Sequence, residues 1–343
     1  MTRPVGVLGT LVVLVPGAVL CGVAVGSVTI PLAAVTGALL DWMPGWTAGD
    51  PNAIERAIVV HLRLPRVLLA AVVGGGLAIS GAALQGLFRN PLADPGIVGV
   101  SSGAAFGAVA AVTTGVATEH PASLPALAFA GALGATTLIY RLSTRHGRTP
   151  LAALLLAGLA VTAFLSAMTS FLLSLAQNVF VLRELVFWLL GGLEGRGWSH
   201  LRLVLLPALL GCLGLVVFAR DLNVVAAAGE EGALSLGVSM QWLKRSMLAL
   251  TALVTGAVVS VSGIVGFVGL LVPHAVRLVV GPDHRVVLPA SFLAGAIFLI
   301  LADLVARTLV PAEELRLGVV TAAVGAPFFL VLLERHRARL ERL

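Results

Sequence analysis

The chain has 343 residues, of which 59% are hydrophobic and only 11% are charged, with a formal net charge of +6 and a mean hydropathy of +1.05. Soluble domains carry about 25% charged residues, so a chain this poor in charge must have lipid as its main solvent. Its basic residues are spread thinly at the ends of apolar blocks rather than gathered in a patch. This pattern argues against nucleic acid as a partner and is typical of membrane-topology signals.

The apolar residues come in long continuous blocks, which favours membrane-spanning helices over the alternating strands of a β-barrel. We therefore expect an all-α polytopic membrane protein with about ten transmembrane helices, forming a single transmembrane domain over residues 1–343. A shorter apolar piece near 180–192 predicts an extra partial helix. The predicted spans lie near residues 6–40, 65–88, 96–117, 122–140, 150–176, 201–219, 246–262, 264–281, 286–310 and 317–333.

Two of these blocks differ from a simple span. The first block is too long for the apolar region of a signal peptide, about 7–15 residues, and we interpret it as a retained span. The block at 264–281 is interrupted by Pro273, His274 and Arg277, which predicts a short or re-entrant helix.

The distribution of basic residues predicts the orientation. With the N-terminus inside and the spans alternating, fourteen of the 22 basic residues lie on the cytoplasmic side and eight lie outside. This bias favours both termini in the cytoplasm. The outer arginines, which include Arg63, Arg66 and Arg307, then require another role. Asp303 and Arg307 are spaced i, i+4 and are expected to neutralise each other on one helix face.

The sequence lacks the nucleotide-binding motif of an ATPase and two common metal-binding motifs. It contains no G-x-x-x-x-G-K-[ST], no H-E-x-x-H and no C-x-x-C. Cys21 and Cys212 lie within apolar runs and are expected to be small buried hydrophobes rather than disulfide or metal partners. Few acidic residues fall at membrane depth, where an ion-coupled carrier usually has several. The chain therefore resembles a translocation pathway without its own energy source, and we predict no catalytic or metal site.

Glycines recur at helix-packing spacing. Gly99, Gly103 and Gly107 form a tandem GxxxG pattern, which allows the backbones of two helices to approach closely in lipid. A sliding or opening surface is the alternative interpretation.

Several ordered motifs along residues 55–335 resemble those of the FecCD family, the permease subunits of bacterial ABC importers for iron–siderophores, haem and cobalamin. Any one motif is weak, but the full order is specific. The motifs are Arg63-Leu64-Pro65-Arg66, Ser80-Gly81 with Gln85, Asn90-Pro91-Leu92-Ala93 with Pro95-Gly96, Trp188-Leu189-Leu190-Gly191-Gly192, Leu222-Asn223, Gly229-Glu230 with Ala233 and Leu236-Gly237, Gly266-Phe267-Val268-Gly269-Leu270 with Pro273-His274 and Arg277, Asp283-His284-Arg285 with Leu288-Pro289, Ala302-Asp303 with Ala306-Arg307, and Gly318 with Thr321-Ala322 and Gly325-Ala326-Pro327.

The resemblance implies a ten-helix subunit of type II ABC importer architecture in the bacterial cytoplasmic membrane. It implies a homodimer with the pathway at the dimer axis, two ATP-binding-cassette ATPase subunits on the cytoplasmic side, and a periplasmic or lipid-anchored substrate-binding protein. The chain would bind no cofactor and catalyse no reaction, because ATP and Mg would be used by the ATPase partner.

The resemblance also assigns roles to residues at the two ends. Arg63, Arg66 and Arg307 would meet carboxylates of the binding protein, for which a guanidinium offers a rigid fork. The alternative is that these arginines snorkel to lipid headgroups. Asn90 and Leu92 would narrow the cytoplasmic mouth, unless Asn90-Pro91-Leu92 is simply a rigid turn.

The polar stretch at about 221–241 resembles the coupling helix of importer permeases, which docks on the ATPase. Within this helix Gly232 departs from the usual pattern, because glycine weakens a helix. An ordinary amphipathic loop is the alternative. The residues assigned to coupling are Gly229, Glu230, Ala233, Leu236 and Gly237.

The cargo is less sharply indicated. Phe88-Arg89-Asn90-Pro91-Leu92-Ala93-Asp94-Pro95-Gly96 with Ser101-Ser102-Gly103 resembles haem permeases most, iron–siderophore permeases next and cobalamin permeases third. An ion-coupled secondary transporter is the alternative from another class. His274 is not expected to ligate haem, because the predicted topology places it near the cytoplasmic mouth.

Overall fold

The computed structural model describes residues 2–26, 28–40, 51–145, 149–176, 178–310 and 313–340. This part of the chain is built from helices joined by short connections, with no strand. Seven helical segments are long and apolar enough to cross a membrane, and three shorter apolar helices accompany them. The seven are α1 (Thr2–Ala24), the segment that ends with α4 (Leu64–Leu87), α7 (Ser123–Ser143), α8 (Leu151–Ser174), α10 (Trp198–Val217), α12 (Met240–Ser262) and α14 (His284–Thr308).

The remaining elements are shorter. The three short apolar helices are α5 (Val100–Thr113), α13 (Val268–Val280) and the apolar part of α15 (Leu317–Leu340). The connecting elements are α2 (Leu32–Leu40), α3 (Ala53–Ala57), the π-helix η1 (Ile58–Arg63), the 3-10 helix η2 (Pro95–Val98), α6 (Val116–Glu119), α9 (Val179–Leu189) and α11 (Ala219–Ser235). The expected ten apolar helices and the extra partial helix near 180–192 are thus confirmed.

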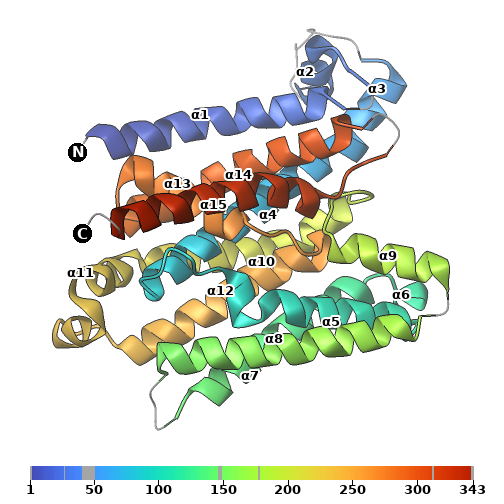
Figure 1. Cartoon of the computed structure of the whole chain (residues 1–343). Helices are drawn as coiled ribbons and strands as arrows, with labels where there is room; N and C mark the ends of the chain where they lie inside the picture. Colours follow the sequence, from blue (N-terminus) through green and yellow to red (C-terminus); the bar gives the residue numbers. More distant parts are fainter. Residues whose placement is uncertain are drawn as a thin grey trace.

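The long helices lie side by side along one axis (Figure 1). The start of α1, the end of α15 and all of α11 lie at one end of the bundle, which we call the α11 end. Helices α2, α3 and α6 lie at the opposite end, the α3 end. Two of the basic residues counted as cytoplasmic, Arg148 and Arg342, fall outside the described residues.

Helix α4 is the centre of the bundle. Every residue from Val73 to Leu87 is buried, as expected for a helix that is apolar all round. Its main partner is α14, and glycines set their separation: a Cβ on Gly74 would lie 2.2 Å from the carbonyl oxygen of Gly295. The α4–α14 pair therefore forms a closely packed rod that reaches from one end of the bundle to the other.

The span expected to begin at residue 65 begins earlier, because α3, η1 and α4 form one continuous helical segment from Ala53 to Leu87. Pro65 has no N–H to donate, and the preceding turns widen into the π-helix η1. The missing N–H leaves the carbonyl oxygen of Val60 free. This oxygen accepts a hydrogen bond of 2.9 Å from the indole N–H of Trp198 at the start of α10. A long-range contact thus stabilises a helix that continues through the proline.

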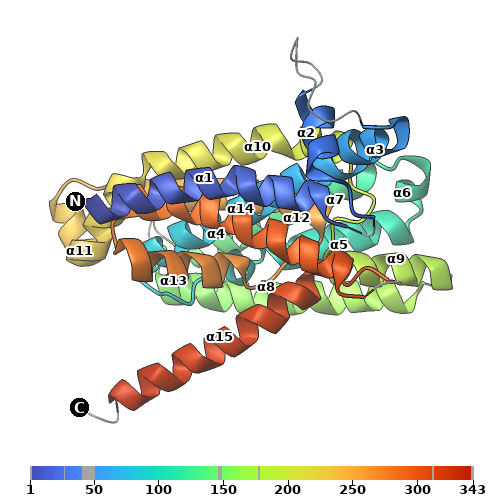
Figure 2. The same cartoon turned by 90° about the horizontal axis from the view of Figure 1, so that it is seen from above.

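Other boundaries also differ from expectation. The block 6–40 is not one helix, because α1 ends at Ala24 and α2 is separate. The block 96–117 begins with the 3-10 turn η2, so α5 has only fourteen residues. The short helix expected in 264–281 is confirmed as α13, which follows Phe267 in a left-handed conformation (φ 67°). Helix α15 leaves the bundle at an angle, as Figure 2 shows.

The GxxxG glycines lie where α5 crosses α7. A Cβ on Gly103 would lie 2.2 Å from the carbonyl oxygen of Gly131, and one on Gly107 would lie 2.0 Å from that of Leu127. Gly99 differs, because it precedes α5 as its N-cap in a left-handed conformation (φ 75°). Two of the three glycines thus allow the backbones to approach, and the third allows a turn.

Candidate functional site

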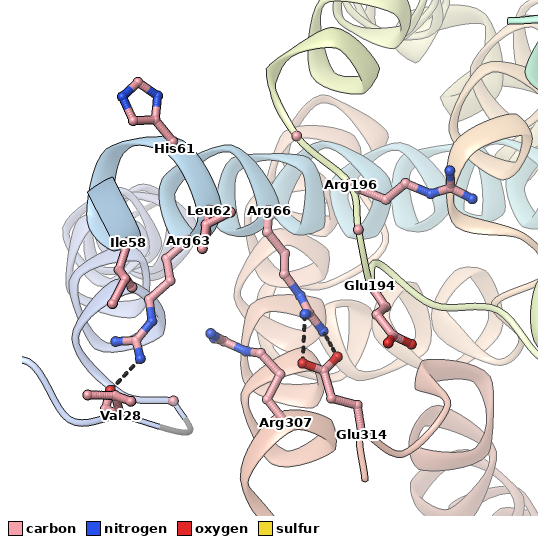
Figure 3. Close-up of a pocket in the computed structure, with 13 residues that line it drawn as sticks. Val28, Ile58, His61, Leu62, Arg63, Arg66, Glu194, Arg196, Arg307 and Glu314 are labelled. Carbon is pink, nitrogen blue, oxygen red and sulfur yellow. Dashed lines mark hydrogen bonds and ion pairs between the residues drawn. The ribbon is translucent and has the colours of Figure 1, made fainter. Parts of the chain in front are cut away.

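A cleft of about 400 Å³ opens at the α3 end, where α4 begins and α14 ends (Figure 3). Its polar side chains are mostly guanidinium groups, with two carboxylates among them. The charged residues that line it are Arg63, Arg66, Arg196, Arg307, Glu194 and Glu314. The structure therefore brings together the three arginines that the sequence assigns to docking.

Arg66 uses both edges of its guanidinium group. Along one edge, Nε and Nη2 donate to Oδ1 of Asp303 at 3.1 and 2.9 Å. Along the other edge, Nη1 and Nη2 donate to the two carboxylate oxygens of Glu314 at 3.1 and 2.8 Å (Figure 3). The side chain of Asp303 is 1% exposed, whereas that of Glu314 is 35% exposed. One carboxylate is thus fixed in the protein and the other lies near the surface.

Arg63 and Arg307 have a different role, because both close the C-terminal end of α1. Arg63 is buried and donates to the carbonyl oxygens of Val23 and Ala24 at 2.9 Å, and to that of Val28. Arg307 donates to the carbonyl oxygen of Gly22 at 2.8 Å. The last carbonyls of a helix have no partner within the helix and carry partial negative charge, which these cations satisfy.

Asp303 and Arg307 form the predicted i, i+4 ion pair, with Oδ2 and Nε 3.1 Å apart. Asp303 thus lies between Arg66 and Arg307 and balances part of their charge. Arg63, Arg66 and Arg307 all bind groups of their own chain rather than extending toward headgroups. Their docking role stays a prediction. Among the three, it is Arg66 whose second guanidinium edge binds a half-exposed carboxylate, that of Glu314.

The sequence reasoning missed the role of Glu314 and a second ion pair, between Arg316 and Glu194 at 2.8 Å. Glu314 and Arg66 are 248 positions apart, so no local spacing indicates their contact. The pair of adjacent acids Glu313-Glu314 just before the last apolar block was the available signal.

The predicted gate residues lie in a turn at the α11 end, directly after α4. The side chain of Asn90 accepts a hydrogen bond of 2.9 Å from the backbone N–H of Leu92, which closes the turn locally. Leu92 is exposed. Arg89 takes a left-handed conformation (φ 48°), and its Nη1 lies 3.3 Å from where a Cβ on Gly229 would be. The turn therefore lies beside α11.

The predicted coupling residues lie in the second half of α11 (Ala219–Ser235) and in the two residues that follow it. Gly229 breaks its helical geometry (φ 73°, ψ 180°), and Gly237 follows its end in a left-handed conformation (φ 86°). A short helix thus runs between these two glycines, with Leu236 exposed and Ala233 fully buried. Gly232 allows the tight corner, because a Cβ there would lie 2.7 Å from the Cβ of Ala228.

The short helix is held to the bundle by the single lysine of the sequence. Nζ of Lys244, at the start of α12, lies 2.7 Å from Oε2 of Glu230 and donates to the carbonyl oxygen of Thr149 at 3.0 Å. Lys244 is buried, whereas Glu230 is half-exposed. One cation therefore ties three separate parts of the chain together.

The first half of α11 is tied to α14. Asn223 donates to Oδ1 of Asp283 at 2.6 Å and accepts from the backbone N–H of His284 at 2.8 Å. Asp283 also caps α14 by accepting from the N–H of Arg285, and this bond and that from Asn223 lower the pKa of Asp283. The imidazole of His284 packs on Gly86 of α4, where a Cβ would lie 2.3 Å from Nε2. The α4–α14 rod therefore makes contact with α11 at this end.

Two further polar groups stabilise the end of α4. Gln85 accepts from Arg277 of α13, and its amide N–H group donates to the carbonyl oxygens of Gly269 and Leu270 at 3.3 Å. Asp94 caps η2 through the N–H of Gly96 at 2.8 Å, and its burial raises its pKa. His274 packs edge-on against Phe328 of α15, with ring centroids 6.1 Å apart.

The described residues contain no group of three or more histidine, cysteine, aspartate or glutamate side chains that could hold a metal ion. A bundle of many apolar helices with charged residues gathered at its two ends is typical of a polytopic membrane protein. Comparison with known proteins gives the family.

The chain matches the FecCD transport family over residues 11–335. It is 50% identical over 291 residues to the cobalamin import system permease protein BtuC of Halobacterium salinarum, covering 85% of this chain and 77% of that protein. It is 42% identical over 301 residues to the hemin transport system permease protein HmuU of Yersinia pestis, covering 85% of this chain and 87% of that protein.

A solved structure, described as an inward-facing conformation of a metal-chelate type ABC transporter, superposes with a TM-score of 0.84 at 32% identity. The superposition covers 96% of this chain and 99% of the solved chain. The chain therefore belongs to the FecCD transport family, and it is a permease of an ABC importer.

Proposed function

We propose that this permease works as a homodimer with two ATP-binding-cassette ATPase subunits and a substrate-binding protein, and imports a metal chelate by alternating access. Both termini and α11 would lie in the cytoplasm, and the cleft at the α3 end would face outward. The chain itself would bind no cofactor, since ATP and Mg belong to the ATPase. The observation that carries this proposal is the exposed short helix of α11, which lies at the same end of the bundle as both chain ends.

That helix is suited to coupling. Its glycine borders set its direction, its exposed leucines offer an apolar face to a partner, and the Lys244–Glu230 pair anchors it to α12. A push on this face would pass through Asn223 to the start of α14, and from there along the α4–α14 rod. Rigid-body transmission of this kind is a common form of conformational switching. The turn at Asn90 and Leu92 lies beside this route and would act as the inner gate.

Docking of the binding protein would take place at the cleft at the α3 end. A cluster of guanidinium groups suits acidic side chains of a protein partner, and such charges orient and accelerate docking more than they tighten it. Arg66 would receive a carboxylate directly. Arg63 and Arg307 would join Arg66 in the docking surface if the end of α1 moves. Otherwise they would support the docking surface by capping α1.

The cargo proposal is a metal tetrapyrrole, haem or cobalamin, with ferric siderophores as the alternative. The motif around Asn90 resembles haem permeases, whereas one relative is named for cobalamin import and another for hemin transport. These names favour the two tetrapyrroles equally. Both are large, partly apolar metal chelates, and the helices of this chain are mostly apolar.

The cargo is tested by reconstituting the permease with its ATPase and its binding protein in liposomes. Uptake of radiolabelled cobalamin, haem and ferric siderophores is then measured in turn, each against the other two as unlabelled competitors. Saturable uptake of one tetrapyrrole is expected. Uptake of ferric siderophores alone would contradict the proposal.

A further inference from the structure

We propose that Glu314 occupies the docking fork of Arg66 in the undocked subunit, and that a carboxylate of the docking protein displaces it. Glu314 would then act as an internal competitor that reports docking to α15. This inference rests on the proposed docking role of Arg66 and adds to it the group that must leave.

The two carboxylates on Arg66 differ in the way that exchange requires. Asp303 binds the Nε edge and is 1% exposed, so it holds the guanidinium group in place whatever happens at the other edge. Glu314 binds the Nη1–Nη2 edge in a two-bond geometry and is 35% exposed. This is the arrangement that an incoming carboxylate would adopt, because a guanidinium group takes a carboxylate along one planar edge. Only Glu314 can leave without stranding a buried charge.

Glu314 lies in the connection between α14 and α15, so its release changes how that connection is held. The next residue, Leu315, donates from its backbone to the carbonyl oxygen of Ala306 at 3.0 Å. Leu317, at the start of α15, donates to that of Gly191 at 3.0 Å. The bidentate bond of Glu314 is the tie from this connection to Arg66 of α4. Its loss would leave α15 attached through α14, the segment after α9 and α13, where His274 packs against Phe328.

Helix α15 is the element placed to respond. It diverges from the other long helices (Figure 2), and large apolar residues along it are exposed, Val324 and Leu330 among them. A helix that packs loosely against its own bundle can change its angle with little loss of contact. Docking at Arg66 would thus loosen the N-terminal end of α15.

The test measures the affinity of the fluorescently labelled substrate-binding protein for the reconstituted transporter. In Glu314→Gln the competitor is weakened, and we expect docking about three- to fivefold tighter, the range for a partly exposed ion pair. Glu313→Gln is the matched control, because Glu313 is the exposed neighbour and the change in net charge is the same. We expect this control to leave the affinity within twofold of that of the wild type.

Arg66→Gln separates the two ideas. It should weaken docking, and Glu314→Gln added to it should give no further tightening. If Arg66→Gln leaves docking unchanged, the docking role itself is wrong. If Arg66→Gln weakens docking but Glu314→Gln behaves like Glu313→Gln, the docking role stands and the competitor is wrong. As a second measurement, docking should increase hydrogen exchange at the backbone of residues 313–318; equal protection in the docked and free states would overturn the link to α15.

Discussion

The ion pair between Lys244 and Glu230 gives the sharpest prediction about the coupling helix, because its two members differ in burial. The Lys244 side chain is 9% exposed and that of Glu230 is 46% exposed. Removing the glutamate leaves a buried ammonium group with the carbonyl oxygen of Thr149 as its remaining partner. Removing the lysine leaves a carboxylate that water can reach.

The free-energy costs should therefore be unequal. A buried charge that loses its partner costs about 1–3 kcal/mol or more, whereas a half-exposed pair contributes at most about 1 kcal/mol. We expect Glu230→Ala to lower the free energy of unfolding by about 2 kcal/mol and Lys244→Met to lower it by about 1 kcal/mol. Both should also reduce the substrate transported per ATP hydrolysed, because each loosens the short helix of α11 from α12.

The assay combines thermal unfolding of the purified transporter with parallel measurements of uptake and ATP hydrolysis in liposomes. Glu231→Ala is the control, since Glu231 is the exposed neighbour on the same short helix. Equal losses for all three variants, or normal coupling in Lys244→Met, would refute the reasoning from burial and anchoring.

Two further predictions concern packing and pH. Gly103→Ala should destabilise the protein or prevent its assembly, because the new Cβ would lie 2.2 Å from the carbonyl oxygen of Gly131. Gly134→Ala is the control and should be neutral, because a Cβ there would have no atom within 4 Å. Equal melting temperatures of the two variants would contradict this prediction. Asp283→Asn should cost about 0.5 kcal/mol at neutral pH, because it removes a negative charge from the N-terminus of α14. Hydrogen bonds from Arg285 and Asn223 lower the pKa of Asp283. The contribution of its carboxylate to stability is therefore present above the usual pKa of aspartate and is lost as the pH falls through the lowered pKa. The difference in melting temperature between the variant and the wild type should shrink below about pH 4, and a difference that grows in acid would exclude this account.

Much of the fold could be predicted from the sequence, because the constraint is local. Ten blocks of apolar residues give ten apolar helices, since backbone groups in lipid must be paired within a helix. The break at Gly229 and the end at Gly237 follow from the conformations that glycine allows. The Asp303–Arg307 pair follows from helix geometry alone.

The remaining features depend on contacts between distant residues. The extension of α4 back to Ala53 requires the indole of Trp198 to satisfy the carbonyl that Pro65 leaves free. The capping of α1 by Arg63 and Arg307 depends on where that helix ends in space. Arginines at the end of a span can cap a helix, bind lipid or meet a partner, and only the folded arrangement separates these roles.

The central claim is that this permease translocates its cargo with energy supplied by a separate ATPase. The most direct measurement is uptake of cobalamin or haem by liposomes that contain the permease and binding protein, with and without the ATPase and ATP. We predict uptake only when ATPase and ATP are both present, and no response to a proton or sodium gradient. Uptake by the permease alone under an ion gradient would contradict the account.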